Sequence, residues 1–188
     1  MVNKVIFLDV DGVLNACNKF YDVVWKICKK LHILKWYDSH FDEFGVKLYR
    51  VFLLWIIVKF TRADIVLSSS WRIGYLNPDR KLTPNQRELE KKLSWFGLHI
   101  HDVTEQLGHR GEEIQTYLFE HPDITNYVIL DDDKYDIIET MGAEHLVITS
   151  YGGPIRGYSY EDTGMKIKDA IKAIKILNQE DKKDEYQN

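Results

Sequence analysis

The sequence predicts an α/β fold, a three-layer sandwich with a central parallel sheet of about five strands. Short apolar runs alternate with segments of helical periodicity along the whole chain, which is the pattern of repeated βα units. A length of 188 residues suits one such domain with its own core and is short for two. The composition, 45% hydrophobic and 29% charged residues, is that of a globular protein.

The strands are expected where the apolar runs are too short for helices and are bounded by polar or turn-forming residues. These runs lie at residues 5–8, 65–67, 98–101, 127–130 and 146–148. Since a helical segment separates consecutive runs in most cases, the strands are expected to pair in parallel, as in a Rossmann-like sheet.

The helices are expected where apolar residues recur every three or four positions. Such segments lie at residues 18–34, 46–60, 84–96, 111–120 and 167–177. The sharpest helix start is Thr83-Pro84-Asn85-Gln86, which offers a capping threonine, a proline at the first position and a glutamine three residues after the cap. In the last helix we expect a buried stripe of Ile167, Ala170, Ile171, Ile174 and Leu177.

One domain over residues 1–178 accounts for these elements. Residues 16–44 form a candidate small helical cap or insert between the first two strands, and residues 179–188 are expected to fray. The most apolar stretch, residues 51–58, is much shorter than the roughly 20 residues of a membrane span. With no signal-peptide pattern and only two cysteines, we expect a cytoplasmic protein without a membrane partner.

Polar side chains follow three of the five predicted strands. Asp9 and Asp11 follow the first strand, Ser68 follows the second, and Asp131 and Asp132 follow the fourth. Sites in open parallel sheets form beyond the carboxyl ends of the strands, so these groups are expected to converge. Carboxylates that converge repel one another unless a cation is present, and hard oxygen ligands suit Mg²⁺.

Each group also has a plainer interpretation. An aspartate after a strand is often only a turn former, the serines at 68–70 could cap a helix, and the acidic run at 131–133 could be a solvated turn. The pattern Asp9-x-Asp11-Gly12 is more specific, because glycine allows a tight turn in which both carboxylates and the backbone face one ligand. The three groups together, each after a strand, favour a site.

These residues resemble the motifs of the haloacid dehalogenase-like (HAD) phosphohydrolase superfamily. The first motif corresponds to Asp9-Val10-Asp11-Gly12-Val13-Leu14 and the second to a strand that ends in Ser68. The third, a basic residue near a helix start, is best matched by Arg110, where lysine is more usual. The fourth, an acidic pair, is matched by Asp131-Asp132. The wider context also resembles the small HAD domains of RNA-repair (Swiss Army knife) proteins.

The resemblance implies a phosphatase mechanism. Asp9 would be the nucleophile that forms an aspartyl-phosphate, and Asp11 would be the general acid and base. Ser68 would bind a phosphoryl oxygen, and Arg110 would offset charge in the transition state.

The implied cofactor is Mg²⁺. Its ligands would be Asp9, the backbone carbonyl of Asp11, and Asp131 or Asp132. Further substrate contacts are expected at Gly12, Ser69 and Arg72.

The substrate class is less constrained than the chemistry. A short insert implies an open site, which suits the terminal phosphates of single-stranded RNA or DNA, and the insert mixes lysines with aromatic residues. The same segment could instead be an amphipathic helix wall, and a net charge of −4 argues against a generic nucleic-acid binder. A small-molecule or phosphoprotein phosphatase and a non-catalytic module with the same fold remain alternatives. No obligate protein partner is expected.

Overall fold

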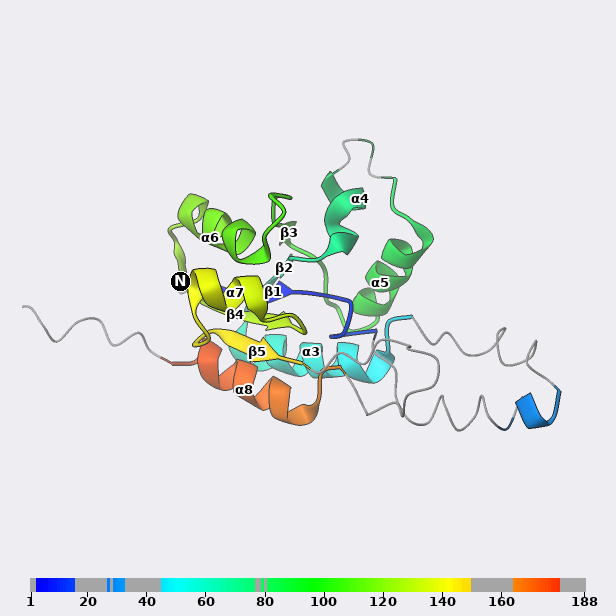
Figure 1. Cartoon of the computed structure of the whole chain (residues 1–188). Coiled ribbons are helices and arrows are strands. Elements are labelled where there is room, and N and C mark those ends of the chain that lie inside the picture. Colours follow the sequence, from blue (N-terminus) through cyan, green and yellow to red (C-terminus); the bar gives the residue numbers. More distant parts are fainter. Residues whose placement is uncertain are drawn as a thin grey trace, which may run out of the picture.

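The computed structural model describes residues 3–15, 27, 29–32, 45–76, 79, 81–149 and 164–179, which form a five-stranded sheet with helices on both faces (Figure 1). The strand order is β3-β2-β1-β4-β5, and every pair is parallel. The strands are β1 (Asn3–Leu8), β2 (Asp64–Leu67), β3 (Asp102–Val103), β4 (Ile124–Asp131) and β5 (Leu146–Ile148). The predicted α/β class is therefore confirmed.

The central strand β1 explains why the sheet is parallel and covered on both faces. Its last four residues are all apolar and buried, which is typical of a strand packed on each side. Phe7 lies level with Val66 of β2 and with Ile129 of β4. This register brings the carboxyl ends of the three strands to the same level.

Two helical layers complete the sandwich. Residues of α3 (Leu48–Thr61), α5 (Pro84–Ser94) and α8 (Ile167–Leu177) share one hydrophobic core with one face of the sheet. Residues of α6 (Arg110–Glu120) and α7 (Tyr135–Met141) share a second core with the other face. Figure 1 shows α3 and α8 below the sheet and α6 and α7 on its opposite side. After β2, a short 3₁₀ turn η1 (Ser70–Arg72) leads into α4 (Ile73–Leu76).

The predicted capping box of α5 is present, but the strand predicted after it is displaced. Thr83 and Gln86 exchange backbone and side-chain hydrogen bonds at the helix start. At the helix end Gly97 adopts φ 68°, and the Leu98 N–H donates to the Leu93 carbonyl at 3.0 Å. Because Leu98 closes the helix, it cannot begin a strand. The predicted strand at 98–101 is therefore wrong, and β3 lies at Asp102–Val103.

The predicted buried stripe of α8 also needs correction. Ala170 and Leu177 are buried as expected, but Ile167 and Ile171 are 68% and 61% exposed. The face turned to the core instead carries Ala173 and Ile176 together with Ala170. The helix has more apolar positions than one face can hold, so periodicity alone could not predict which face is turned to the core.

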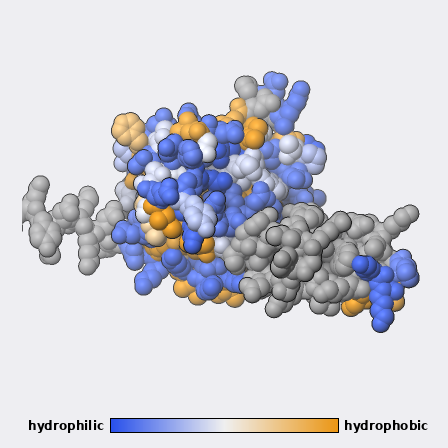
Figure 2. Space-filling view, viewed as in Figure 1, coloured by the Kyte–Doolittle hydropathy of each residue, from blue (hydrophilic) through white to orange (hydrophobic). Residues whose placement is uncertain are grey.

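The predicted insert at 16–44 lies outside the described residues except for 27 and 29–32, and the predicted frayed tail does so except for residue 179. Within the described part of the chain, no helix is long and apolar enough to cross a membrane. On the face seen in Figure 2, hydrophobic residues lie in small separate groups among hydrophilic ones.

Candidate active site

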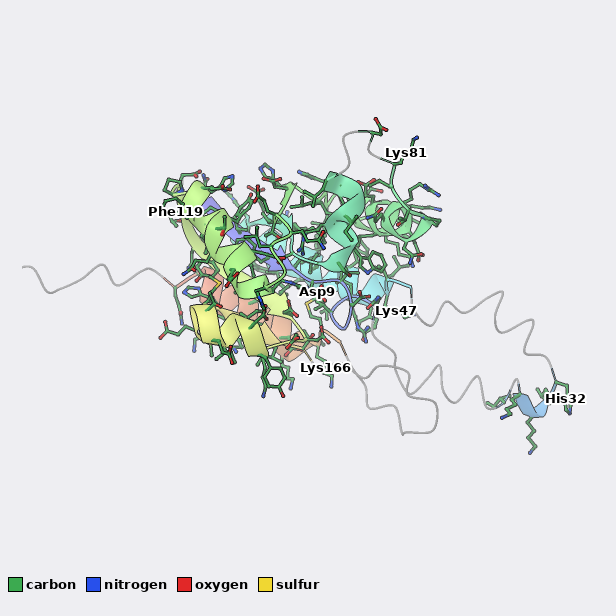
Figure 3. All side chains as sticks on the ribbon, turned by 45° about the horizontal axis from the view of Figure 1, so that its top comes forward. Asp9, His32, Lys47, Lys81, Phe119 and Lys166 are labelled. Carbon is green, nitrogen blue, oxygen red and sulfur yellow. The ribbon has the colours of Figure 1, made fainter. Side chains whose placement is uncertain are left out.

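The site lies where β1, β2 and β4 end. Asp9 follows β1, Ser68 follows β2, and Asp131 is the last residue of β4. The backbone continues the ladder by one step, since the Asp9 N–H donates to the Leu130 carbonyl and the Ser68 N–H to the Leu8 carbonyl, both at 2.9 Å. Figure 3 shows Asp9 near the centre of the molecule, between the helical layers. The parallel register thus brings residues more than a hundred positions apart to one edge.

Three carboxylates converge at this edge. Asp9, Asp131 and Asp132 each offer an oxygen atom within 4.8 Å of the others. Asp9 and Asp131 are buried, and Asp132 is half-buried. Asp133 is exposed, and its Oδ1 accepts the Tyr135 N–H at 3.1 Å. It therefore hydrogen-bonds the first residue of α7 and is not part of the cluster. A set of hard oxygen donors at this spacing fits a divalent cation such as Mg²⁺.

The electrostatics of the cluster also favour a cation. Burial, opposed by Arg110 and assisted by repulsion from Asp9, raises the pKa of Asp131 to about 7. Burial, with repulsion from Asp9, raises the pKa of Asp132 to about 6. Burial likewise raises the pKa of Asp9, against opposing effects of Arg110 and of a hydrogen bond from Ser69. A cation that binds all three carboxylates would offset this cost of desolvation and repulsion.

Arg110 bridges two of these carboxylates. Its Nη1 donates to Asp131 Oδ2 at 2.6 Å and to Asp9 Oδ1 at 3.2 Å, and it also donates to the Ser68 carbonyl. The side chain is 23% exposed, so it is not sealed from solvent. The structure thus brings the predicted third-motif residue together with the residues predicted for the other motifs.

The start of α6 is held in place by α7. The backbone N–H groups of Arg110 and Gly111 both donate to the Asp136 carboxylate, which caps α6 from a neighbouring helix. A Cβ on Gly111 would lie 2.7 Å from Thr140 Cβ and 2.8 Å from the Asp136 carbonyl oxygen, so only glycine permits this close approach. Asp136 was not predicted as a site residue, because its contact depends on how two helices pack.

Arg72, predicted to contact substrate, is buried in an ion pair. Its Nη2 lies 2.6 Å from Glu113 Oε1, and its Nη1 donates to the Ser69 carbonyl at 3.1 Å. Glu113 Oε1 also accepts the N–H groups of Leu107 and Gly108 at 3.1 and 3.2 Å. This pair ties the turn after β2 to α6 and to the loop before it. Its substrate role stays a prediction. Glu113 was not predicted as a site residue, and its pairing with Arg72 is seen only in the fold.

Asp11 faces different partners from the other carboxylates. Its Oδ1 accepts the Asn15 amide at 2.6 Å, and its Oδ2 accepts the Trp71 indole N–H at 3.0 Å. Asp11 is half-buried, and its carboxylate is not a member of the three-carboxylate cluster. The predicted metal contact through its backbone carbonyl stays a prediction. Asn15 was not predicted as a site residue, although it directly follows the first motif.

Gly12 provides the turn that the sequence predicted. Its φ is 71°, and a Cβ there would lie 2.4 Å from Asp132 Cγ. Its carbonyl accepts the Thr149 hydroxyl at 2.8 Å, which links the turn to the end of β5. A residue other than glycine at this position would displace Asp132.

Two buried serine side chains adjoin the cluster. Ser68 Oγ has no hydrogen-bond partner among the described residues, although the side chain is almost fully buried. Buried hydroxyls are normally paired, so an orphan beside Asp9 marks a place where a ligand oxygen can bind. Ser69 is fully buried and accepts the Trp71 backbone N–H at 3.4 Å.

Comparison with known protein families matches residues 5–153 to the HAD domain in Swiss Army Knife RNA repair proteins. Searches of curated proteins and of solved structures gave no significant match. The family match covers four strands in full, the last four residues of β1, and every residue of the strand-end site. It supports a HAD-type phosphohydrolase as the general class of activity. With its parallel sheet and its strand-end carboxylates, this chain belongs to the family of HAD domains found in Swiss Army Knife RNA repair proteins.

Proposed function

We propose that the protein is a Mg²⁺-dependent phosphomonoesterase that forms an aspartyl-phosphate on Asp9. The observation that carries the proposal is the cluster of Asp9, Asp131 and Asp132 within 4.8 Å, next to the Arg110 guanidinium. The orphan hydroxyl of Ser68 supports it, because a phosphoryl oxygen supplies the acceptor that this buried group lacks.

In the first step a carboxylate oxygen of Asp9 attacks phosphorus and the bond to the ester oxygen breaks. Asp11, in its protonated form, gives its proton to that leaving oxygen. Arg110 and Ser68 donate hydrogen bonds to the phosphoryl oxygens, where negative charge must be stabilised. The products of this step are the free alcohol and the aspartyl-phosphate.

In the second step water attacks the phosphorus of the aspartyl-phosphate. Asp11, now a carboxylate, accepts a proton from that water, and the bond between phosphorus and Asp9 breaks. Inorganic phosphate leaves, and both carboxyl groups return to their starting states. Mg²⁺ would be held by Asp9, by the backbone carbonyl of Asp11 and by Asp131 or Asp132, and it would supply charge neutralisation for the phosphoryl group.

The terminal phosphate of a polynucleotide is the substrate class that we propose. The family to which the chain belongs is described from RNA repair proteins, which supports this class. The position of Arg110, 23% exposed at the edge of the cluster, is compatible with a phosphate that arrives from solvent on a larger molecule.

The nucleophile is tested by replacing Asp9 with asparagine. Wild type should hydrolyse a chromogenic phosphate ester with Mg²⁺ and lose that activity in EDTA, whereas Asp9→Asn should be inactive under both conditions. Asp64→Asn is the matched control, because Asp64 is exposed at the opposite end of β2. Equal activity of Asp9→Asn and wild type would refute the assignment.

The substrate class is tested by comparing 3′- and 5′-phosphorylated RNA and DNA oligonucleotides with mononucleotides, sugar phosphates and a phosphopeptide. We expect the highest kcat/KM for oligonucleotide ends. A clear preference for small phosphate esters or for the phosphopeptide would reject the polynucleotide proposal and leave the chemistry intact.

A further inference from the structure

The Asp11 carboxylate is held from two sides. The Trp71 indole Nε1 donates to Oδ2 at 3.0 Å, and the Asn15 side-chain amide donates to Oδ1 at 2.6 Å. The indole comes from the turn after β2, 60 residues along the chain, whereas Asn15 lies in the same turn as Asp11. Two donors on the two oxygens fix both the position of the carboxylate and its rotation about the Cβ–Cγ bond.

Each donor is itself held in one orientation. The Asn15 carbonyl oxygen accepts the Gly12 N–H at 3.0 Å, so its amide nitrogen must face Asp11. The Trp71 carbonyl accepts the side-chain amide of Gln86, which belongs to the capping box of α5. Trp71 also packs against the larger hydrophobic core. The indole N–H therefore reaches Asp11 from a rigid support.

Core packing alone requires an aromatic ring at position 71 but not an N–H group aimed at Asp11. A phenylalanine ring would fill most of the same space, but it carries no N–H group. The bond to Asp11 uses the single polar atom of the side chain, and an indole N–H usually finds a partner where it is partly buried. Here that partner is the general acid and base of the proposed reaction.

We propose that Trp71 is a positioning residue for Asp11, and that its indole N–H aims the Asp11 carboxyl at the leaving-group oxygen. This inference rests on the proposed phosphatase function. Each Asp11 oxygen accepts one of these two donors and keeps a second lone pair, so proton exchange with a leaving group remains open. Correct aim matters because a small misplacement of a proton donor lowers the rate strongly.

Trp71→Phe tests the inference, because it keeps an aromatic ring and removes the N–H donor. Protonation is needed most by a basic leaving group, so two substrates are compared, an alkyl phosphate and 4-nitrophenyl phosphate. General acid catalysis raises the rate about 10²–10⁴-fold, and a misplaced Asp11 carboxyl should lose part of this increase. For Trp71→Phe we expect kcat/KM to fall about tenfold with the alkyl phosphate and less than about twofold with 4-nitrophenyl phosphate.

Two further variants separate positioning from folding. Asn15→Ala removes the opposite donor and should show the same dependence on the leaving group, which keeps the test available if Trp71→Phe folds poorly. Trp95→Phe is the matched control, because Trp95 is 57% exposed at the end of α5, and it should behave as wild type. In an Asp11→Ala background, Trp71→Phe should cause no further loss, since there is no carboxyl left to aim.

Equal losses with the two substrates, or the same loss in the Asp11→Ala background as in wild type, would overturn the positioning role. These outcomes differ from a failure of the proposed function. That failure would show as wild-type activity in Asp9→Asn and Asp11→Ala themselves, before Trp71 is changed.

Discussion

Glu113→Gln should destabilise the protein by about 3 kcal/mol, because it leaves the buried Arg72 guanidinium without a counter-charge. The Arg72 and Glu113 side chains are only 6% and 3% exposed, and their charged atoms are 2.6 Å apart. Removing one partner of a buried pair typically costs about 3–5 kcal/mol. Glutamine keeps an oxygen that can accept the Leu107 and Gly108 N–H groups, so we expect the lower end of this range.

Urea unfolding followed by circular dichroism measures the free energy of unfolding, and the matched control is Glu88→Gln. Glu88 pairs with Lys92 one helical turn away, and both side chains keep solvent contact at 33% and 18% exposure. Such a pair contributes about 0.3–0.5 kcal/mol. Arg72→Met combined with Glu113→Gln should recover part of the loss, since the unpaired charge is then gone. A Glu113→Gln protein within 1 kcal/mol of wild type, on the order of the control, would refute this account of the pair.

Two further predictions concern the acidic cluster. Gly12→Ala should abolish the thermal stabilisation by Mg²⁺, because the added Cβ would overlap Asp132. The control is Gly97→Ala, which has a similar φ of 68° and open space around the Cβ among the described residues, and which should cost only about 1–2 kcal/mol of backbone strain. Normal Mg²⁺ stabilisation of Gly12→Ala would contradict this prediction. The pKa values of Asp131 and Asp132, raised from 3.8 to about 7 and about 6, mean that the metal-free protein loses stability as pH rises from about 4 to 7. Mg²⁺ binds the ionised forms, so at pH 8 and 10 mM Mg²⁺ a dissociation constant of about 1 mM would add about 1.4 kcal/mol, or a rise in Tm of about 3–6 °C. At pH 5 calorimetry should show almost no rise, and an equal rise at both pH values would argue against a site made of these carboxylates.

The sheet and its strand-end residues could be predicted because both depend on local sequence. An apolar run that ends in Asp9 or Ser68 fixes a strand and its last residue, and parallel pairing then aligns the ends without further information. The predicted strand at 98–101 failed for a local reason as well. Leu98 has the apolarity of a strand residue, but its backbone N–H is used to close α5 after Gly97.

The contacts borne by helices could not be predicted in the same way. Arg72 in the turn after β2 meets Glu113 of α6 across 41 positions, and nothing in the spacing of either residue points to the other. The same holds for the Trp71 bond to Asp11 and for the Asp136 cap on α6. The helix contacts depend on the rotation and offset of packed helices, which a hydrophobic stripe constrains only loosely, as the misassigned stripe of α8 shows. The Trp71 bond to Asp11 instead joins two turns that are 60 positions apart.

Arg110, the residue predicted for the third motif, also makes contacts that depend on this packing. A single nitrogen, Arg110 Nη1, meets the carboxylates of Asp9 and Asp131, while Nε of the same guanidinium lies 4.0 Å from Glu113 Oε2. A lysine ammonium is a compact charge with no second group to direct toward Glu113. Glu113 Oε1 pairs with Arg72, and Glu113 Oε2 lies at ion-pair distance from Arg110, so the carboxylate lies between the two arginines. The departure from the usual lysine is therefore accompanied by a buried acidic partner one helical turn further along α6, and the two positions are best considered together when function is inferred from either.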